Sequence, residues 1–199
     1  MNIVLDVGNV LIDFKPLLFL RKLFSDQSLV NKMNNTIFLS PEWVRLDEGR
    51  ITHKEACSIF CIREPDYRSE ILYTMQNLTD MLTPMTSTIE LLPGIKESGH
   101  NLYYLSNYHE ELRDYIIDRY QFFSLFDGGV FSCDVHLVKP SQAIFHLFLS
   151  KYSLSGENCL FFDDDEINVI AARNAGFNSV LFSDYKCLAP LLSARFQQG

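Results

Sequence analysis

The chain has 199 residues, of which 47% are hydrophobic and 21% charged, a composition typical of a folded globular protein rather than a disordered one. Its length suits one domain, or one core with a smaller insertion. The net charge of −8 and the lack of a dense Lys/Arg run exclude a general attraction for nucleic acid. An anionic ligand must therefore be bound by local groups, such as backbone N–H, one or two lysines, or a metal.

The N-terminus and the cysteines predict a cytoplasmic protein without a membrane segment. The chain has no basic segment before its first apolar run, which meets Asp6, so a signal peptide is not expected. No apolar stretch reaches the length of about 18 residues that a membrane span needs. The cysteines lack the spacing of a zinc site and are expected to be free thiols in a reducing compartment: Cys57, Cys61, Cys133, Cys159 and Cys187.

Short apolar runs, bounded by Gly, Asn, Ser or Asp, predict the buried strands of a parallel sheet. In chain order they are Asn2–Leu5, Leu102–Leu105, Gly129–Phe131, Cys159–Phe162 and Ser179–Phe182. Helical patterns lie between the later strands. Ser141 is expected to cap a helix that runs to about Tyr152, and Gly176 to end another. Alternating strands and helices indicate an α/β fold.

The stretch from about Pro16 to Met85 shows helix signals and no convincing strand. Ser40-Pro41 reads as an N-cap followed by the first helical residue, and the sequence from Thr52 to Glu55 as a capping box. One longer helix is expected to carry four apolar residues on one face, Ile71, Met75, Leu78 and Leu82. The chain is therefore expected to form one strand, leave the sheet for about 70 residues of helix, and return.

Polar side chains follow four of the predicted strands. Asp6 follows the first, Ser106 and Asn107 the second, Lys139 comes beyond the third, and an acidic run from 163 to 165 follows the fourth. Because ligands bind at the carboxyl ends of strands in open parallel sheets, we expect these side chains to share one cleft.

These residue types suit phosphoryl transfer through an aspartyl-phosphate. A carboxylate such as Asp6 can attack phosphorus, but it cannot approach an anionic phosphate unless the charge is neutralised. Mg²⁺ bound by carboxylates and a backbone carbonyl, together with a lysine, supplies that neutralisation. The hydroxyl of Ser106 and the N–H of Asn107 can bind the phosphoryl oxygens.

The segments LDVGNVL, YLSN, VKP and FFDDDEIN resemble, in this order and across the whole chain, the four motifs of haloacid dehalogenase-superfamily hydrolases. The helical insertion resembles the C1-type cap of the subfamily that includes β-phosphoglucomutase and α-glucose-1-phosphate phosphatase. The resemblance implies an α/β core with a Rossmann-like parallel sheet, formed by residues 1–15 and 86–199, and an inserted helical cap formed by residues 16–85.

The resemblance also implies a Mg²⁺ site. Asp6 would be both the nucleophile and a metal ligand, Gly8 would offer its backbone carbonyl, and Asp164 would complete the protein ligands. Asp163 would lie behind these ligands, and Asn168 would orient metal-bound water.

The remaining implied roles concern the substrate. Lys139 would contact Asp6 and the phosphoryl group, while Ser106 and Asn107 would bind its oxygens. The expected partner is a small phosphorylated metabolite, with no nucleic acid and no membrane, and the expected state is a monomer or homodimer.

Position 8 departs from the usual phosphatase motif, Asp-x-Asp-Gly-Thr. The second Asp of that motif protonates the leaving alcohol and then activates water, but this chain has Gly8 there. Loss of a general acid/base typically costs about 10²–10⁴ in rate. Asp13, His109 and His136 are candidates to substitute, although each is more simply expected to be a surface polar residue. A sugar 1-phosphate, whose leaving group needs less protonation, would suit such a site.

Three functions remain open at this point. The first is a Mg²⁺-dependent phosphatase that acts on a small phosphorylated metabolite, such as a sugar phosphate. The second is a 2-haloacid dehalogenase, which needs no metal and is disfavoured by the acidic fourth motif. The third is a catalytically weak protein that binds a phosphorylated ligand, which the glycine at position 8 motivates. In the expected cap, four residues lie near the turn at Gly49, where a cap loop faces the substrate in this family: Trp43, Arg45, Asp47 and Glu48. Trp43 is more simply expected to be a core residue, and none of the four is chosen as a site residue.

Overall fold

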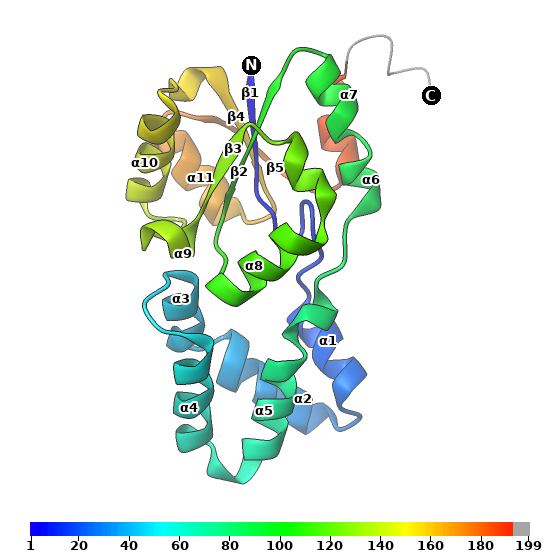
Figure 1. Cartoon of the computed structure of the whole chain (residues 1–199), viewed down its shortest axis with the longest axis vertical. Coiled ribbons are helices and arrows are strands. Elements are labelled where there is room, and N and C mark those ends of the chain that lie inside the picture. The colour runs from blue at the N-terminus through cyan, green and yellow to red at the C-terminus, as the bar shows by residue number, and fades with distance from the viewer. Residues whose placement is uncertain (193–199) are drawn as a thin grey trace.

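The computed structural model describes residues 1–192 and contains a five-stranded parallel sheet with the order β3-β2-β1-β4-β5 (Figure 1). The strands are β1 (Asn2–Leu5), β2 (Asn101–Ser106), β3 (Gly128–Phe131), β4 (Cys159–Asp163) and β5 (Asn178–Leu181). The predicted α/β class with a Rossmann-like parallel sheet is confirmed, and every strand bound lies within one residue of its predicted place. The last residues of the expected core range, 193–199, lie outside the described residues.

Helices cover both faces of the sheet because successive strand residues point to opposite faces. Val4 belongs to the cluster under α10 (Gln142–Tyr152) and α11 (Glu166–Asn174). Its neighbours Ile3 and Leu5 belong to the other cluster, which includes side chains of α7 (Leu92–Glu97) and α8 (Glu110–Arg119). All three strand residues are fully buried. The resulting sandwich of helix, sheet and helix forms the upper part of the molecule in Figure 1.

The predicted helix signals act as expected around the last strands. The Ser141 side chain accepts a hydrogen bond from the backbone N–H of Ala143 at 3.3 Å, at the start of α10. Gly176 follows the end of α11 with a φ of +90°, a left-handed conformation that favours glycine. Both cap predictions are therefore confirmed.

A group of helices is inserted in the chain between β1 and β2, and it lies below the sheet in Figure 1. It comprises α1 (Pro16–Leu23), α2 (Gln27–Met33), α3 (Pro41–Asp47), α4 (His53–Arg63) and α5 (Arg68–Gln76). The N-cap at Ser40 and the capping box between Thr52 and Glu55 are both present. The single longer helix expected to reach Leu82 is wrong: α5 ends at Gln76, and a 3₁₀ turn, Leu78–Met81, follows. Its four apolar residues are still buried: Ile71 and Met75 lie in α5, Leu78 lies in the 3₁₀ turn, and Leu82 directly follows it.

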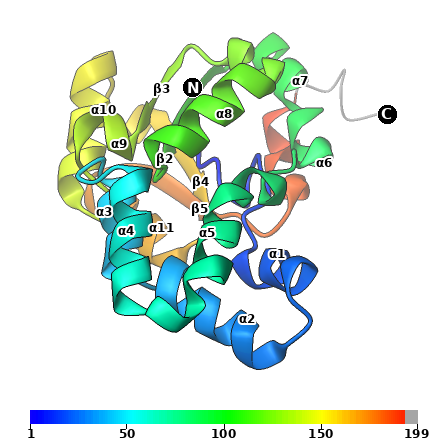
Figure 2. The same ribbon diagram turned by 60° about the horizontal axis from the view of Figure 1, so that its bottom comes forward.

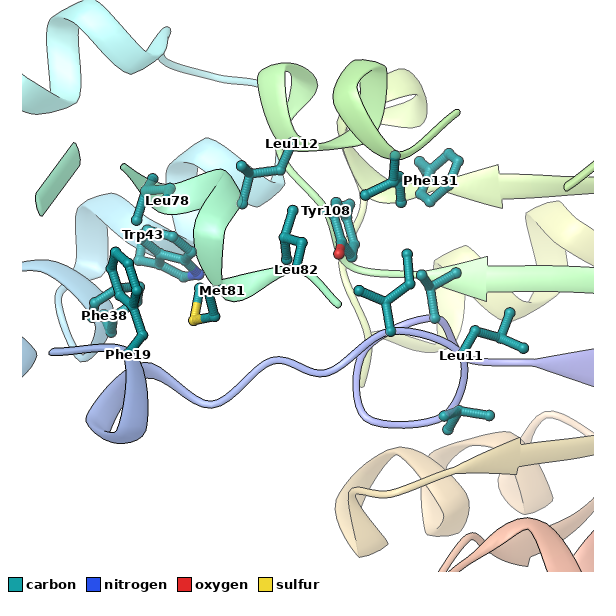
Figure 3. Close-up of a cluster of buried hydrophobic side chains, with 14 of the residues drawn as sticks. Leu11, Phe19, Phe38, Trp43, Leu78, Met81, Leu82, Tyr108, Leu112 and Phe131 are labelled. Atoms are coloured by element: carbon teal, nitrogen blue, oxygen red, sulfur yellow. The ribbon is translucent and has the colours of Figure 1, made fainter. Parts of the chain in front are cut away.

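One continuous apolar cluster joins these helices to the sheet. Figure 3 shows it passing from Phe19, Phe38 and Trp43 through Leu82 to Tyr108 and Phe131. Burial across this junction is what positions the helices over the carboxyl ends of the strands. The short helices are the π turn Asn34–Phe38, the 3₁₀ turns Pro65–Tyr67, Gln121–Leu125, Gly156–Asn158 and Tyr185–Leu191, and the one-turn α6 (Thr86–Ile89) and α9 (Ser132–Val135).

Two further features concern the cysteines and the lengths of the helices. All five cysteines are free thiols. Within residues 1–192, no helix has both the length and the apolar character that crossing a bilayer requires.

Candidate active site

The site lies where the strand order changes direction, at the carboxyl ends of β1, β2 and β4. β1 pairs with β2 on one side and with β4 on the other, so the residues that follow these strands meet. Asp6 directly follows β1, and its backbone N–H donates to the carbonyl of Phe162 at 2.9 Å. This bond extends the ladder by one residue and places Asp6 beside Asp163, the last residue of β4.

Lys139 connects these two carboxylates. Its ammonium lies 2.8 Å from Oδ1 of Asp6 and 2.6 Å from Oδ2 of Asp163. The lysine side chain is 1% exposed and the Asp163 side chain 0%, so water screens neither pair. Such an arrangement is costly to bury unless every charge has a partner.

One ammonium between two carboxylates leaves an excess negative charge, and the pKa values reflect it. Burial, aided by the charge of Asp163, raises the pKa of Asp6 to about 7, although Lys139 opposes the rise. Burial alone would lower the pKa of Lys139, but the two carboxylates outweigh it and raise that pKa. Asp6 therefore exchanges a proton near neutral pH as long as no further cation is bound.

The acidic residues present a place for such a cation. Asp6, Asp163 and Asp164 each offer a carboxylate oxygen, and the three atoms lie within 4.8 Å of one another. Both oxygens of Asp163 are engaged: Oδ2 contacts Lys139, and Oδ1 accepts from the backbone N–H of Asp165 at 2.8 Å. Asp6 and Asp164 also accept hydrogen bonds, but unlike Asp163 they line the open cavity, and two carboxylates with open neighbouring positions suit Mg²⁺.

A cavity of about 240 Å³ opens over these groups. The residues predicted from the sequence that line it are Asp6, Gly8, Ser106, Asn107, Lys139, Asp164 and Asn168. Asp163 is the exception, because it is fully buried behind Lys139. The structure thus brings the predicted residues together, while their individual roles stay predictions.

Asn107 and Asn168 support the charged centre with their side chains. Asn107 accepts from the backbone N–H of Lys139 at 2.8 Å and donates to the carbonyl of Lys139 at 3.0 Å. This reciprocal pair fixes the backbone from which the lysine side chain enters the site. Asn168 donates to both oxygens of Asp163, at 3.1 and 3.2 Å, so its side-chain amide orients that carboxylate.

One residue beside the carboxylates is not predicted from the sequence. Asn9 donates from Nδ2 to Oδ2 of Asp164 at 2.9 Å and accepts from the backbone N–H of Phe14 at 2.9 Å. Its φ of +52° is a conformation that asparagine tolerates better than most residues. An asparagine directly after the glycine of the first motif was the available signal.

Of the three proposed substitutes for the missing acid/base, one expectation is wrong. His109 is 2% exposed rather than on the surface, because its ring packs against Trp43 with 5.2 Å between ring centroids. Asp13 forms an ion pair with Lys15 and does not line the cavity. His136 donates from Nδ1 to the carbonyl of Glu48 at 2.8 Å, so its ring contacts the inserted helices.

The turn after α3 docks on α9, and the two lie next to each other in both views of the molecule (Figures 1 and 2). The hydroxyl of Ser132 donates to the carbonyl of Asp47. The same hydroxyl accepts from the backbone N–H of Tyr108 at 2.9 Å. One side chain of α9 therefore ties the inserted helices to the loop after β2.

Gly49→Ala tests this docking. Gly49 has a φ of +64°, and an added Cβ would lie 2.5 Å from the backbone carbonyl oxygen of Cys133, which must then move. We expect a loss of about 1–3 kcal/mol in the free energy of unfolding, measured by urea titration. Gly99→Ala is the matched control, since Gly99 has a φ of +86° but no atom within 4 Å of an added Cβ. Equal losses in the two variants would contradict close docking at Gly49.

The family model of haloacid dehalogenase-like hydrolases matches residues 1–176. The chain belongs to this family. The resemblance noted in the four motifs is thereby confirmed at the level of the superfamily, and the chain is a member of a hydrolase family.

Two curated relatives are similar over most of this chain. The sesquiterpene phosphatase astK of Aspergillus oryzae is 25% identical over 181 residues, which are 91% of this chain and 89% of that protein. The drimenol cyclase drtB of Aspergillus calidoustus is 25% identical over 183 residues. These are 90% of this chain but 33% of the cyclase, so this chain spans about a third of that protein's length.

Solved structures share the fold. A HAD-family enzyme of Bacteroides thetaiotaomicron, in complex with magnesium and inorganic phosphate, superposes with a TM-score of 0.72 at 18% identity and covers 94% of this chain and 98% of its own. A dehalogenase superposes with a TM-score of 0.73 at 16% identity, with 96% of each chain covered. Because one enzyme binds phosphate and the other is a dehalogenase, the fold alone does not select the reaction.

Proposed function

We propose that this protein is a Mg²⁺-dependent phosphatase that hydrolyses a small phosphorylated metabolite through an aspartyl-phosphate. One observation carries the proposal. The ammonium of Lys139 lies 2.8 Å from Oδ1 of Asp6 and neutralises part of its charge, and the nearby carboxylate of Asp164 can bind a cation together with Asp6. A carboxylate with two cationic partners can approach an anionic phosphate. The phosphatase name of the Aspergillus oryzae relative and the magnesium and phosphate in the Bacteroides structure support this assignment.

Each residue has a defined task in this proposal. The Asp6 carboxylate attacks phosphorus, and Lys139 orients that carboxylate and stabilises the charge on the phosphoryl oxygens. Ser106 and the backbone N–H of Asn107 bind these oxygens. Asp6, Asp164 and the carbonyl of Gly8 would bind Mg²⁺, which neutralises phosphate charge when bound. Asp163 orients the ammonium of Lys139, and Asn168 in turn orients the carboxylate of Asp163.

We propose that residues 16–85 act as a cap over a core formed by residues 1–15 and 86–199. Trp43 and Asp47, both from α3, line the same cavity as Asp6, so these inserted residues can contact a substrate whose phosphate lies on the core. A cap that closes over this cavity would exclude water during attack by Asp6.

A sugar phosphate is the first substrate class to examine, because a leaving group at the anomeric carbon needs little protonation at a site with glycine at position 8. A specific observation favours a second class. Phe14, Trp43 and Leu112 give part of the cavity an apolar wall, which suits a hydrocarbon group on the phosphate. Isoprenyl monophosphates therefore belong in the same screen, and the sesquiterpene phosphatase relative supports their inclusion.

Hydrolysis of p-nitrophenyl phosphate tests the proposal directly, because its leaving group needs little protonation. We expect release of p-nitrophenol with Mg²⁺ and none with excess EDTA. Folded protein that binds Mg²⁺ but releases no product from this probe, sugar phosphates or isoprenyl phosphates would favour a silent phospho-ligand binder. Chloride release from 2-chloropropionate in EDTA would instead identify a dehalogenase.

Mg²⁺ affinity is expected to rise with pH. Since the pKa of Asp6 is raised to about 7, a proton competes with the metal below that pH and is lost above it. The apparent Kd at pH 6 should be roughly tenfold weaker than at pH 8, as measured by calorimetry. In Asp6→Asn no such proton competes, so Mg²⁺ binding should be weak with a flatter pH profile. An unchanged affinity of the unmodified protein across this range would contradict Asp6 as a ligand.

We also propose a cytoplasmic location. Five free thiols, two of them in α4, are stable in a reducing compartment.

A further inference from the structure

The proposed phosphatase reaction lacks a proton donor at position 8. The first step expels an alkoxide that needs a proton, and the second needs a group to take a proton from water. Four carboxylates line the cavity. Asp6 and Asp164 have roles already, and Asp165 accepts from the backbone N–H of Ile167 at 2.9 Å as the N-cap of α11. The fourth is Asp47, the last residue of α3.

Asp47 reaches the cavity because of where α3 lies. Trp43 and Asp47 are four residues apart, so they lie on the same face of the helix, and both line the cavity. The Trp43 ring anchors this face against Phe38, with 4.8 Å between ring centroids, and against His109. The bond from Ser132 to the Asp47 carbonyl fixes the backbone at the other end of the face.

The Asp47 carboxylate is also chemically free. Among residues 1–192, no hydrogen bond or ion pair engages its oxygens, in contrast to Glu48, whose carboxylate contacts Arg50 at 3.0 Å. Burial, together with the negative charge of Asp6, raises the pKa of Asp47 to about 8, although Lys139 opposes the rise.

His109 lines the same cavity but suits the donor role poorly. Burial, and to a lesser extent the neighbouring His53, lowers the pKa of His109 to about 3, so its ring carries no proton to give near neutral pH. The same low pKa makes the neutral ring a weak base, so His109 is also poorly suited to take a proton from water in the second step.

We propose that Asp47, from the inserted helices, replaces the acid/base that position 8 lacks, an inference that rests on the proposed phosphatase function. In the first step an Asp6 oxygen bonds to phosphorus, the bond from phosphorus to the leaving oxygen breaks, and the Asp47 carboxyl gives that oxygen its proton. In the second step Asp47 takes a proton from water, whose oxygen attacks phosphorus. The bond from phosphorus to Asp6 breaks, inorganic phosphate leaves, and both side chains return to their starting states.

Asp47→Asn tests the proposal by its dependence on the leaving group. With an alkyl phosphate, chosen from the substrates that the unmodified protein hydrolyses, kcat should fall by about 10²–10⁴. With p-nitrophenyl phosphate the first step needs no acid, so one equivalent of p-nitrophenol should appear in a rapid burst before slow turnover. If Asp47 has only a structural role, its replacement would lower the turnover of both substrates by the same factor, and no burst of p-nitrophenol would appear.

Two further variants complete the experiment. Glu48→Gln is the matched control, since it alters the adjacent carboxylate, which does not line the cavity, and should keep turnover within about threefold. Gly8→Asp in the Asp47→Asn background should recover alkyl-phosphate turnover at least tenfold. An added Cβ at Gly8 would meet only Phe14 Cβ, at 3.9 Å, which is an ordinary van der Waals contact.

The outcomes separate the two levels of inference. If the unmodified protein hydrolyses no phosphate ester, the proposed function fails. If it is an Mg²⁺-dependent phosphatase but Asp47→Asn keeps alkyl-phosphate turnover within threefold, the role of Asp47 fails alone. A double variant that binds Mg²⁺ yet stays as slow as Asp47→Asn also contradicts that role, because restoring a proton donor then restores nothing.

Discussion

Asp6→Asn is expected to lower the turnover of p-nitrophenyl phosphate by a factor on the order of 10⁴ or more, because loss of a covalent nucleophile leaves only binding and charge stabilisation. The variant should fold, since an amide is similar in size to a carboxylate. It also removes one of the two negative charges beside Lys139, which lie 2.8 and 2.6 Å from the ammonium. Thermal unfolding in EDTA should therefore show a midpoint no lower than that of the unmodified protein.

Asp13→Asn is the matched control for the loss of a carboxylate. Asp13 lies seven positions later in the same loop, contacts Lys15 and does not line the cavity. Its turnover should stay within about threefold of the unmodified protein. Mass spectrometry after rapid quenching should also find a phosphorylated protein in the unmodified chain and none in Asp6→Asn. Wild-type turnover in Asp6→Asn would rule out the covalent mechanism.

The sequence predicts the sheet and the charged centre well because both depend on local signals. Asp6 must lie at the carboxyl end of β1 once Asn2–Leu5 is a buried strand, and Ser106 follows from β2 in the same way. The order of the strands then brings these ends together. Lys139 is less constrained, since it lies eight residues beyond Phe131, the last residue of β3, and its position depends on the Asn107 pair.

The inserted helices show the limit of such prediction. The caps at Ser40 and Thr52 depend on neighbouring residues and were predicted. The end of α5 at Gln76 was not, because the apolar spacing continues through Leu78 and Leu82, which reach the same apolar cluster from the 3₁₀ turn and its end. Asp47 was visible as a residue near a turn. Nothing in the sequence reports that Ser132, 85 positions away, bonds to its carbonyl and brings it to the cavity.

Lys139→Met is expected to affect both stability and activity. Methionine fills a similar volume but leaves Asp6 and Asp163 buried side by side without their shared cation. Breaking a buried pair by removing one partner typically costs about 3–5 kcal/mol, and activity should fall by at least about 10²-fold because the phosphoryl charge is less stabilised. Urea unfolding and p-nitrophenyl phosphate hydrolysis measure the two effects.

The stability loss should depend on pH in a defined direction. Lys139 lowers the pKa of Asp6, so its removal raises that pKa further above the value in the unfolded chain. The folded variant then binds a proton that the unfolded chain has released, and its stability falls as pH rises from about 4 through the raised pKa. The difference from the unmodified protein should therefore be small at pH 5 and larger at pH 8.

The double variant Lys139→Met/Asp163→Asn separates charge balance from packing. It removes one of the two facing carboxylates, so it should regain part of the stability at pH 8 without regaining activity. Lys151→Met is the control for loss of a lysine, because Lys151 is exposed and donates to the Gly129 carbonyl at 3.1 Å. A double variant as unstable as Lys139→Met at pH 8 would show that packing by the lysine stem, rather than compensation of two buried charges, is what Lys139 contributes.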